Sequence, residues 1–135
     1  NLTLPPVVRS GGMGLEEIFS MFPNLYERRT NPGTKLSGGE QQMLGMARIL
    51  RTGANMLLLD EITEGMAQVI VEKLGEVLIA LKNKGLTIVL VEQNCHFAAP
   101  LADRHYVVEH GQIVEEISAN ELSAKQSVLD GYLGV

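Results

Sequence analysis

Residues 56–91, MLLLDEITEGMAQVIVEKLGEVLIALKNKGLTIVLV, contain two short apolar runs on either side of a helical pattern. The runs are Met56–Leu59 and Thr87–Val91, and each is too short for a free-standing helix. Apolar residues between the runs repeat at helical spacing, and Gly85 ends the repeat: Ile70, Leu74, Val77, Leu78 and Leu81. Strand, helix and strand in this order predict a βαβ unit with parallel strands. Unbroken apolar strands also predict a sheet that is buried on both faces.

The flanking segments predict helices before this unit and a hairpin after it. Leu15–Phe22 has helical spacing that ends at the next residue, a proline, and a second short helix is expected over Asn24–Arg29. After the βαβ unit we expect a helix over Asn94–Ala102, then a hairpin and two short terminal helices. The strands and turn of the hairpin are expected at Arg104–Glu109, Gln112–Ile117 and His110–Gly111.

The composition is that of a globular chain with an aliphatic core: 135 residues, 45% hydrophobic, 20% charged and 4% aromatic. A net charge of −5 without a run of Lys or Arg argues against nucleic acid as a partner. The single cysteine, Cys95, excludes an intrachain disulfide. No apolar run reaches the length of a membrane span and no signal-peptide pattern opens the sequence. We therefore expect a cytosolic protein that would reach a membrane only by binding a partner protein.

The heptad Leu36-Ser37-Gly38-Gly39-Glu40-Gln41-Gln42 combines a helix start with two glycines. Ser37, followed three residues later by Glu40, is a capping box, and the helix it starts is expected to reach Arg51 before Gly53. Backbone N–H groups and the helix dipole at such a start attract an anion such as phosphate. Taken alone, Ser-Gly-Gly is more often a flexible cap.

Two carboxylates follow the first apolar run, in Met56-Leu57-Leu58-Leu59-Asp60-Glu61. A buried strand that ends in Asp60 fixes a carboxylate at the carboxyl edge of the sheet, where it can hold hydrated Mg²⁺. The adjacent Glu61 can polarise a water molecule as a general base. Taken alone, this pair is commonly a solvated strand end, but the heptad upstream favours the functional interpretation.

Together, the heptad and the acidic strand end resemble the signature and Walker B motifs of the ABC ATPases. Further segments resemble the branched-chain amino acid importer subgroup of that family: Thr63–Ala67, Val91–Asn94, Phe97–Arg104 and Glu109–Val114. The resemblance implies an α/β fold of the P-loop NTPase type, represented by its C-terminal half. Residues 1–52 would form the helical signature subdomain. Residues 53–135 would form the C-terminal part of the RecA-like core, with a partial parallel sheet and a terminal hairpin.

The resemblance also implies ATP and Mg²⁺ as cofactors. In the family, the signature Ser and glycines contact the γ-phosphate of ATP held by the opposite subunit. The implied nucleotide-binding residues are Ser37, Gly38, Gly39, Glu40, Gln42 and Asp60. Asp60 would hold Mg²⁺ through water, and Glu61 and Gln93 would be the catalytic residues.

Three departures from the family pattern bear on activity. Most ABC ATPases have His at the position of Gln93, whereas the branched-chain subgroup also has Gln there. The neutral side-chain amide of Gln93 can still donate a hydrogen bond to a phosphate oxygen. Ile62 and Gln68 replace two prolines around the D-loop, the turn after Walker B, and this loosens the backbone there. The third departure is that the 135 residues contain no Walker A loop, so we expect them to hydrolyse ATP negligibly by themselves.

Two hypotheses about function follow. The first is an ATP-binding and ATP-hydrolysing subunit of a transporter that imports branched-chain or related amino acids, although related subgroups import amides or urea. Two such subunits would sandwich ATP head to tail, peripheral to the inner membrane on its cytoplasmic side. The helical subdomain would contact transmembrane permease subunits. The apolar candidates for this contact are Met13, Phe19, Met21 and Phe22, and the alternative is that they pack inside the subdomain. The second hypothesis is a truncated, non-catalytic interaction module that self-associates through exposed sheet edges.

Overall fold

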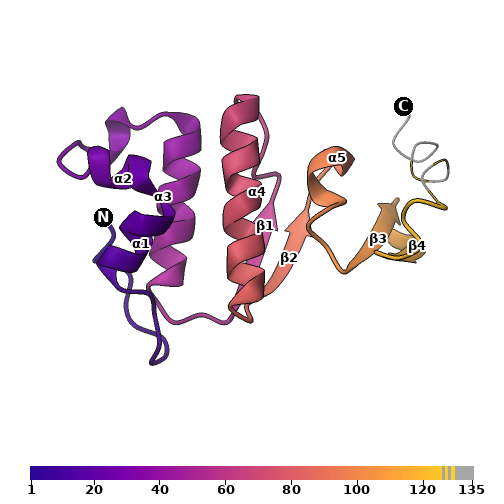
Figure 1. Cartoon of the computed structure of the whole chain (residues 1–135), viewed down its shortest axis with the longest axis horizontal. Helices are drawn as coiled ribbons and strands as arrows, with labels where there is room; N and C mark the ends of the chain where they lie inside the picture. Colours follow the sequence, from indigo (N-terminus) through magenta and orange to yellow (C-terminus); the bar gives the residue numbers. More distant parts are fainter. Residues whose placement is uncertain (126, 128, 130–135) are drawn as a thin grey trace. The chain divides into compact units, whose positions relative to one another are not determined.

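The computed structural model describes residues 1–125, 127 and 129. The chain forms two compact units, Asn1–Val91 and Glu92–Val135 (Figure 1). The first unit contains several helices followed by a βαβ unit, and the second contains a short helix and a hairpin. Within the described residues, no helix is long and apolar enough to cross a membrane.

Short helices form the first part of the first unit: α1 (Leu15–Met21), α2 (Pro23–Glu27), the 3-10 helix η1 (Gly33–Lys35) and α3 (Gly38–Leu50). The helices predicted here are present. Pro23 takes the first position of α2, where a helix needs no N–H donor. The buried apolar side chains of this part come from α1, from α2 and the residue before it, and from one face of α3: Ile18, Phe22, Leu25, Met43, Met46, Ala47 and Leu50.

The loop before α1 is bonded to the C-terminal end of α3. The amides of Val8 and Arg9 donate to the carbonyl oxygen of Thr52 at 2.8 and 3.0 Å, and the amide of Met13 donates to that of Leu50 at 3.1 Å. These bonds satisfy carbonyl groups that have no partner inside the helix. The loop before α1 therefore follows a path fixed by the end of α3.

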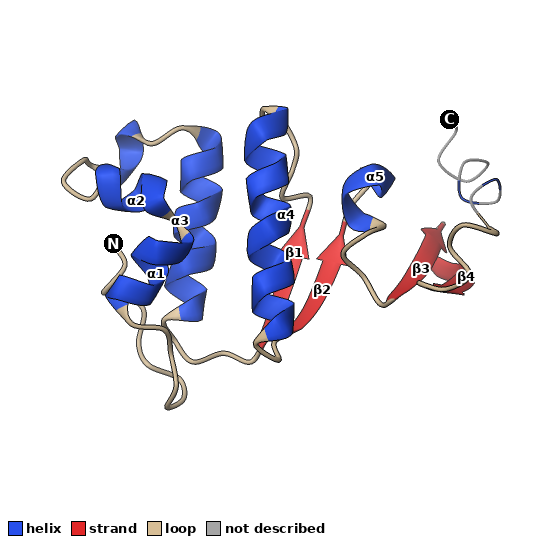
Figure 2. Ribbon diagram, viewed as in Figure 1, coloured by secondary structure: helices blue, strands red, loops and turns tan. Residues whose placement is uncertain are grey.

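The predicted βαβ unit is confirmed. It consists of β1 (Met56–Asp60), α4 (Gln68–Asn83) and β2 (Thr87–Val91) (Figure 2). The strands are parallel, with Met56 paired to Thr87 and Asp60 paired to Val91. Gly85 follows α4 with a φ of 87°, a left-handed conformation that suits glycine at the end of a helix.

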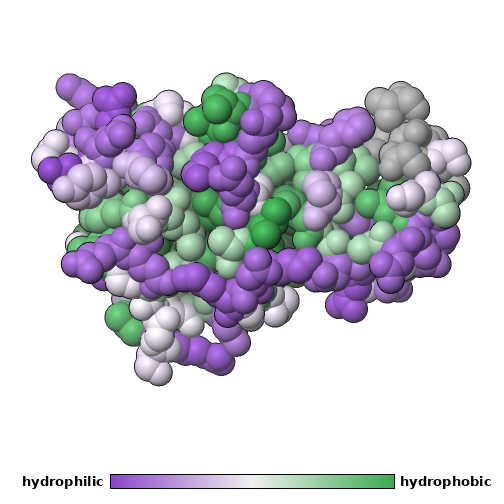
Figure 3. Space-filling view, in the orientation of Figure 1, coloured by the Kyte–Doolittle hydropathy of each residue, from purple (hydrophilic) through white to green (hydrophobic). Residues whose placement is uncertain are grey.

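The prediction that this sheet is buried on both faces is wrong. Leu57 is 2% exposed, whereas its neighbour Leu58 is 75% exposed, and on the paired strand Val89 and Val91 are 46% and 55% exposed. Successive side chains of a strand point to opposite faces, so one face is covered and the other is open. A single helix, α4, packs against the sheet in Figure 2, and one helix cannot cover two faces. Figure 3 draws the side on which α4 lies in front of the sheet, and apolar residues interrupt the hydrophilic surface on that side as well.

The hairpin of the second unit is confirmed. Its strands are β3 (Arg104–Glu109) and β4 (Gln112–Ser118), which pair antiparallel with an irregularity between Val107 and Val108. The turn residues His110 and Gly111 have φ values of 49° and 77°. Two consecutive positive φ angles are the requirement of a type I′ turn, whose twist matches that of the strands.

Two helix predictions in the second unit need correction. The helix expected over 94–102 is only α5 (Cys95–Ala98), because Pro100 has no N–H to continue it. Residues 119–125 form turns instead of a helix. There the amide and hydroxyl of Ser118 donate to the Glu121 carboxylate at 3.2 and 2.6 Å. The rest of the terminal prediction lies for the most part outside the described residues.

Candidate functional site

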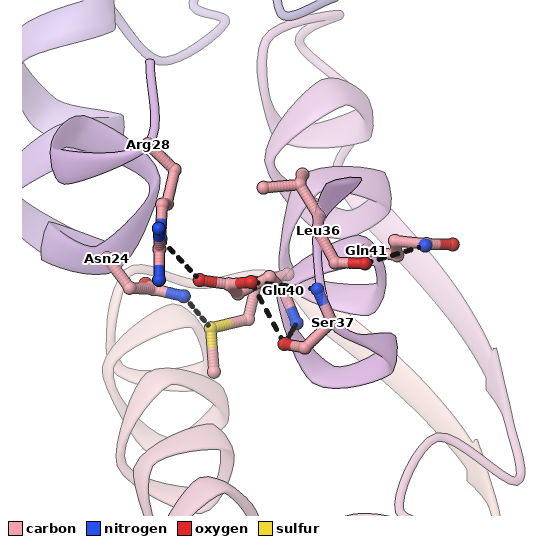
Figure 4. Close-up of polar contacts among 7 residues, drawn as sticks. Asn24, Arg28, Leu36, Ser37, Glu40 and Gln41 are labelled. Carbon is pink, nitrogen blue, oxygen red and sulfur yellow. Dashed lines mark hydrogen bonds and ion pairs between the residues drawn. The ribbon is translucent and has the colours of Figure 1, made fainter. Parts of the chain in front are cut away.

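The predicted capping box is present at the N-terminus of α3 (Figure 4). The hydroxyl of Ser37 accepts a hydrogen bond from the amide of Glu40 at 3.3 Å. In return, Oε2 of Glu40 accepts from the amide of Ser37 at 2.8 Å and from its hydroxyl at 3.0 Å. These bonds, led by the one from the Ser37 amide, hold the pKa of the Glu40 carboxyl below its usual value.

The capping box leaves two backbone donors at the start of the helix. Within the described residues, the amides of Gly38 and Gly39 donate to no protein acceptor, because they occupy the first turn. Gln41 bonds back to the carbonyl of Leu36 at 2.9 Å, and Gln42 is exposed on the helix surface. The end of α3 therefore offers two amides and the positive end of the helix dipole to an anion.

The two glycines meet different surroundings. A Cβ atom on Gly38 would have no atom within 4 Å, whereas one on Gly39 would lie 2.9 Å from Cγ2 of Ile70 and 3.8 Å from Sδ of Met66. Gly39 is thus pressed against the first turn of α4 and the loop before it. This contact connects the signature helix directly to the segment that follows Walker B.

Arg28 is a neighbour of this site that the sequence analysis missed. Its Nε lies 3.4 Å from Oε1 of Glu40, and one turn earlier, on α2, the side-chain Nδ2 of Asn24 donates to Sδ of Met43 at 3.1 Å. The adjacent Arg29 has the same charge, so the sequence alone gives no signal of which arginine faces the signature helix.

The two Walker B carboxylates lie where the parallel strands end. Asp60 is the last residue of β1 and pairs with Val91, the last residue of β2. Glu61 turns away from the strand with a φ of 46°, and its amide donates to the carbonyl of Val91 at 2.9 Å. Left-handed backbone is uncommon at a residue with a long side chain and costs about 1–3 kcal/mol, so the surrounding structure holds this turn. Both residues are exposed to solvent.

The residues after Walker B anchor the turn. Ile62 and Thr63 are only 6% and 8% exposed, so the isoleucine that replaces the family's proline is part of the core. Two backbone hydrogen bonds form the turns that follow. The backbone N–H of Glu64 donates to the carbonyl of Glu61 at 3.3 Å, and that of Met66 donates to the carbonyl of Thr63 at 3.2 Å. These contacts give the D-loop segment a defined path without the proline.

Gln68, the second replacement, is the first residue of α4. Its amide side chain donates to the Glu72 carboxylate at 3.3 Å, one turn further along the helix. Proline is well tolerated at this first position, so either residue fits the backbone.

Gln93, the remaining candidate, belongs to the second unit and is exposed. It directly precedes Asn94, whose side chain caps α5 by accepting from the amide of Phe97 at 3.1 Å. Ser37 to Gln42, Asp60 and Glu61 all lie in the first unit. The structure thus gathers the signature and Walker B residues in one unit.

The carboxylates at the end of β1 suit Mg²⁺ held mainly by phosphate and water. Mg²⁺ keeps several waters and uses one or two carboxylates in nucleotide sites. Within the described residues, no group of three or more His, Cys, Asp or Glu side chains could hold a metal ion by itself. Asp60, at the end of β1, offers one such carboxylate.

Sequence comparison connects this geometry to a family. Residues 13–64 match the family model described as ABC transporter. The high-affinity branched-chain amino acid transport ATP-binding protein BraG of Pseudomonas aeruginosa is 41% identical over 120 residues, which are 89% of this chain and 52% of BraG. The probable branched-chain amino acid transport ATP-binding protein LivF of Archaeoglobus fulgidus is 36% identical over 109 residues, covering 80% and 46%. The chain spans about half the length of the curated relatives it matches.

Solved structures show the same relation. The ADP conformation of an ATP-binding cassette of an ABC transporter matches with a TM-score of 0.69 and 25% identity, over 89% of this chain and 50% of that one. A dimeric cassette in a post-hydrolysis state with ADP and Pi matches with a TM-score of 0.66 and 26% identity, over 82% and 51%. The chain thus has the α/β fold of part of an ATP-binding cassette, as predicted. Its relatives in sequence are ATP-binding proteins of ABC transporters.

Proposed function

We propose that the chain is part of the ATP-binding, ATP-hydrolysing subunit of an ABC transporter that imports branched-chain or related amino acids. The observation that carries the proposal is the N-terminus of α3, where the capping box leaves the Gly38 and Gly39 amides available to an anion. The names of BraG and LivF support the class of solute.

In this proposal each candidate residue has a separate task. Ser37, Gly38 and Gly39, with Glu40 and Gln42 beside them, form the surface that meets a nucleotide held by a second subunit. Asp60 holds Mg²⁺ through water, and bound Mg²⁺ supplies neutralisation of phosphate charge. The carboxylate of Glu61 accepts a proton from the attacking water, and the side-chain amide of Gln93 donates a hydrogen bond to a phosphate oxygen.

The proposed partners are a second ATP-binding subunit, arranged head to tail, and transmembrane permease subunits at the cytoplasmic side of the inner membrane. Permease contact is assigned to the helical subdomain, residues 1–52, and that boundary stays a prediction. Phe22 is 1% exposed and belongs to the core, so it is not available to a partner. Met13, Phe19 and Met21 are half-buried and keep part of their apolar surface exposed.

The test joins this chain to the N-terminal half of a BraG-type relative, which supplies the Walker A loop, and measures phosphate release. We expect activity in the joined protein, loss of it in Glu61→Gln, and retention of it in Glu64→Gln. Glu64 is a suitable control because it is an exposed carboxylate three residues away in the same turn. The 135 residues alone should hydrolyse ATP negligibly, since they lack the loop that grips the phosphates. Equal activity in the two glutamine variants would contradict the role of Glu61.

A second candidate function is a non-catalytic module that self-associates, and the open face of the sheet favours it. Met56, Leu58, Val89 and Val91 form an exposed apolar strip on β1 and β2. Within the described residues these two strands pair only with each other, so each keeps an unpaired edge. Light scattering at high protein concentration separates the candidates, because a stable monomer would contradict self-association.

A further inference from the structure

We propose that Arg28 is a positioning residue of the signature motif. In this inference its guanidinium holds the Glu40 carboxylate in the capping box and offsets its charge, so that the start of α3 presents the Gly38 and Gly39 amides to an anion. The inference rests on the proposed function for the identity of that anion, a phosphate group. The role of Arg28 toward Glu40 stands on the geometry of the two helices.

The geometry begins with the placement of α2 against α3. The amide of Arg28 donates to the carbonyl of Asn24 at 3.1 Å, so both residues lie on consecutive turns of one helical face. Asn24 contacts Met43 at 3.1 Å, and Arg28 contacts Glu40 at 3.4 Å (Figure 4). Met43 and Glu40 are also one turn apart, on α3. Two contacts spaced by one turn on each helix fix both the height and the rotation of α2, and so direct the arginine toward Glu40.

Both oxygens of the Glu40 carboxylate are engaged. Oε2 accepts from the amide and hydroxyl of Ser37, and Oε1 faces the guanidinium of Arg28. The side chain of Glu40 is only 17% exposed, whereas that of Arg28 is 56% exposed. A carboxylate at the start of the helix lies close to the place where a phosphate would bind, and like charges repel. A cation on the other oxygen reduces this repulsion without removing the cap.

Arg29 provides a matched control in the same sequence. Its guanidinium lies 4.1 Å from the ring centre of Tyr26 and donates to the carbonyl of Tyr26 at 2.8 Å. Arg29 therefore carries the same charge as Arg28 and lies beside it at the C-terminal end of α2, but the contacts of its guanidinium are with Tyr26 of α2. Replacing either arginine removes one positive charge, and only Arg28 faces the signature helix.

The first experiment is a side-chain NMR titration of Glu40 in the full chain, with unchanged amide spectra elsewhere as the test of folding. Removing the positive charge beside Glu40 in Arg28→Gln should raise the pKa of the Glu40 carboxyl toward its ordinary value. Arg28→Lys, which keeps the charge, should restore most of the effect, and Arg29→Gln should leave the pKa of Glu40 nearly unchanged. Equal changes in the Arg28→Gln and Arg29→Gln variants would overturn the inference.

The second experiment follows the Gly38 and Gly39 amide resonances during addition of inorganic phosphate. In Arg28→Gln the apparent affinity should fall by about 1.5- to 5-fold, with recovery in Arg28→Lys. An unchanged affinity in Arg28→Gln would contradict the effect of Arg28 on the anion. If the unsubstituted chain showed no response to phosphate, anion binding at the start of α3 would be contradicted, and with it the main support for the proposed function. The Glu40 titration would still decide whether Arg28 positions the carboxylate.

Discussion

The contact between Gly39 and α4 gives the sharpest prediction. A Cβ atom at Gly39 would lie 2.9 Å from Cγ2 of Ile70, closer than real Cβ contacts allow. Ile70 is β-branched and stiff at χ1 within a helix, so its methyl group cannot swing aside at low cost. We therefore expect Gly39→Ala to force a shift between α3 and α4, at a cost of about 1–3 kcal/mol for the overpacked contact.

Gly45 is the matched control for this substitution. It lies in the same helix, and a Cβ atom there would have no atom within 4 Å. Gly45→Ala should stabilise the chain by about 0.5–1 kcal/mol, because alanine loses less backbone entropy than glycine in a helix. Much of this gain also applies to Gly39→Ala, so the difference between the two variants measures the contact with Ile70. We expect Gly39→Ala to be about 1–3 kcal/mol less stable than Gly45→Ala.

Urea unfolding of the full chain supplies the free energies, and a double-mutant cycle with Ile70→Ala isolates the contact. If the overpacking is real, Gly39→Ala should cost much less in the Ile70→Ala background, with a coupling of about 0.5–3 kcal/mol. Equal stability of Gly39→Ala and Gly45→Ala, or a cycle without coupling, would contradict a steric contact between position 39 and Ile70. Either result would mean that Gly39 does not need its small size for packing against α4.

Three further predictions concern the cap, its pH dependence and the core. Ser37→Ala should lower the free energy of unfolding by about 0.5–2 kcal/mol through loss of the cap, measured by urea titration, and an unchanged value would show that the capping box does not stabilise α3. The pKa of Glu40 is lower in the folded chain than in the unfolded chain, so its ionised carboxylate stabilises the fold. This contribution to the free energy of unfolding is complete above the unfolded-state pKa and is lost as the pH falls through the folded-state pKa. The acid-induced loss of stability should therefore be smaller in Glu40→Gln, and an identical pH profile would contradict this. Leu81→Ala, at a residue that is 0% exposed, should cost about 2–5 kcal/mol in thermal or urea unfolding, whereas Ile79→Ala, at a residue that is 45% exposed on the same helix, should cost much less.

Local patterns were sufficient for most of the elements. The two strands of the βαβ unit were predicted to within one residue, because short apolar runs flanked a helix of clear period. The capping box was predicted from two residues, since its hydrogen bonds connect groups three positions apart. The hairpin turn at His110–Gly111 was equally local. The overlong helix prediction after Asn94 failed at Pro100, whose missing N–H outweighed the apolar pattern.

Burial could not be read from the same patterns. The apolar run of β1 predicted cover on both faces, but Leu58 is 75% exposed because only one helix of the described residues packs on the sheet. Whether a strand face is covered depends on which other segments reach it, and no local periodicity records that. The role of Phe22 as core and not as contact surface was decided in the same way, by the packing of α1, α2 and α3.

The sequence by itself determined the candidate motifs, the order of the elements and the α/β class, because each depends on residue types at fixed short spacing. Only the tertiary structure decided which groups meet at the signature helix. Arg28 and Glu40 are 12 residues apart, and Gly39 and Ile70 are 31 apart. Contacts at such separations depend on how whole helices pack, since packing sets the height and rotation of every side chain on them. That is why Arg28 and its neighbour look alike in the sequence and differ in the fold.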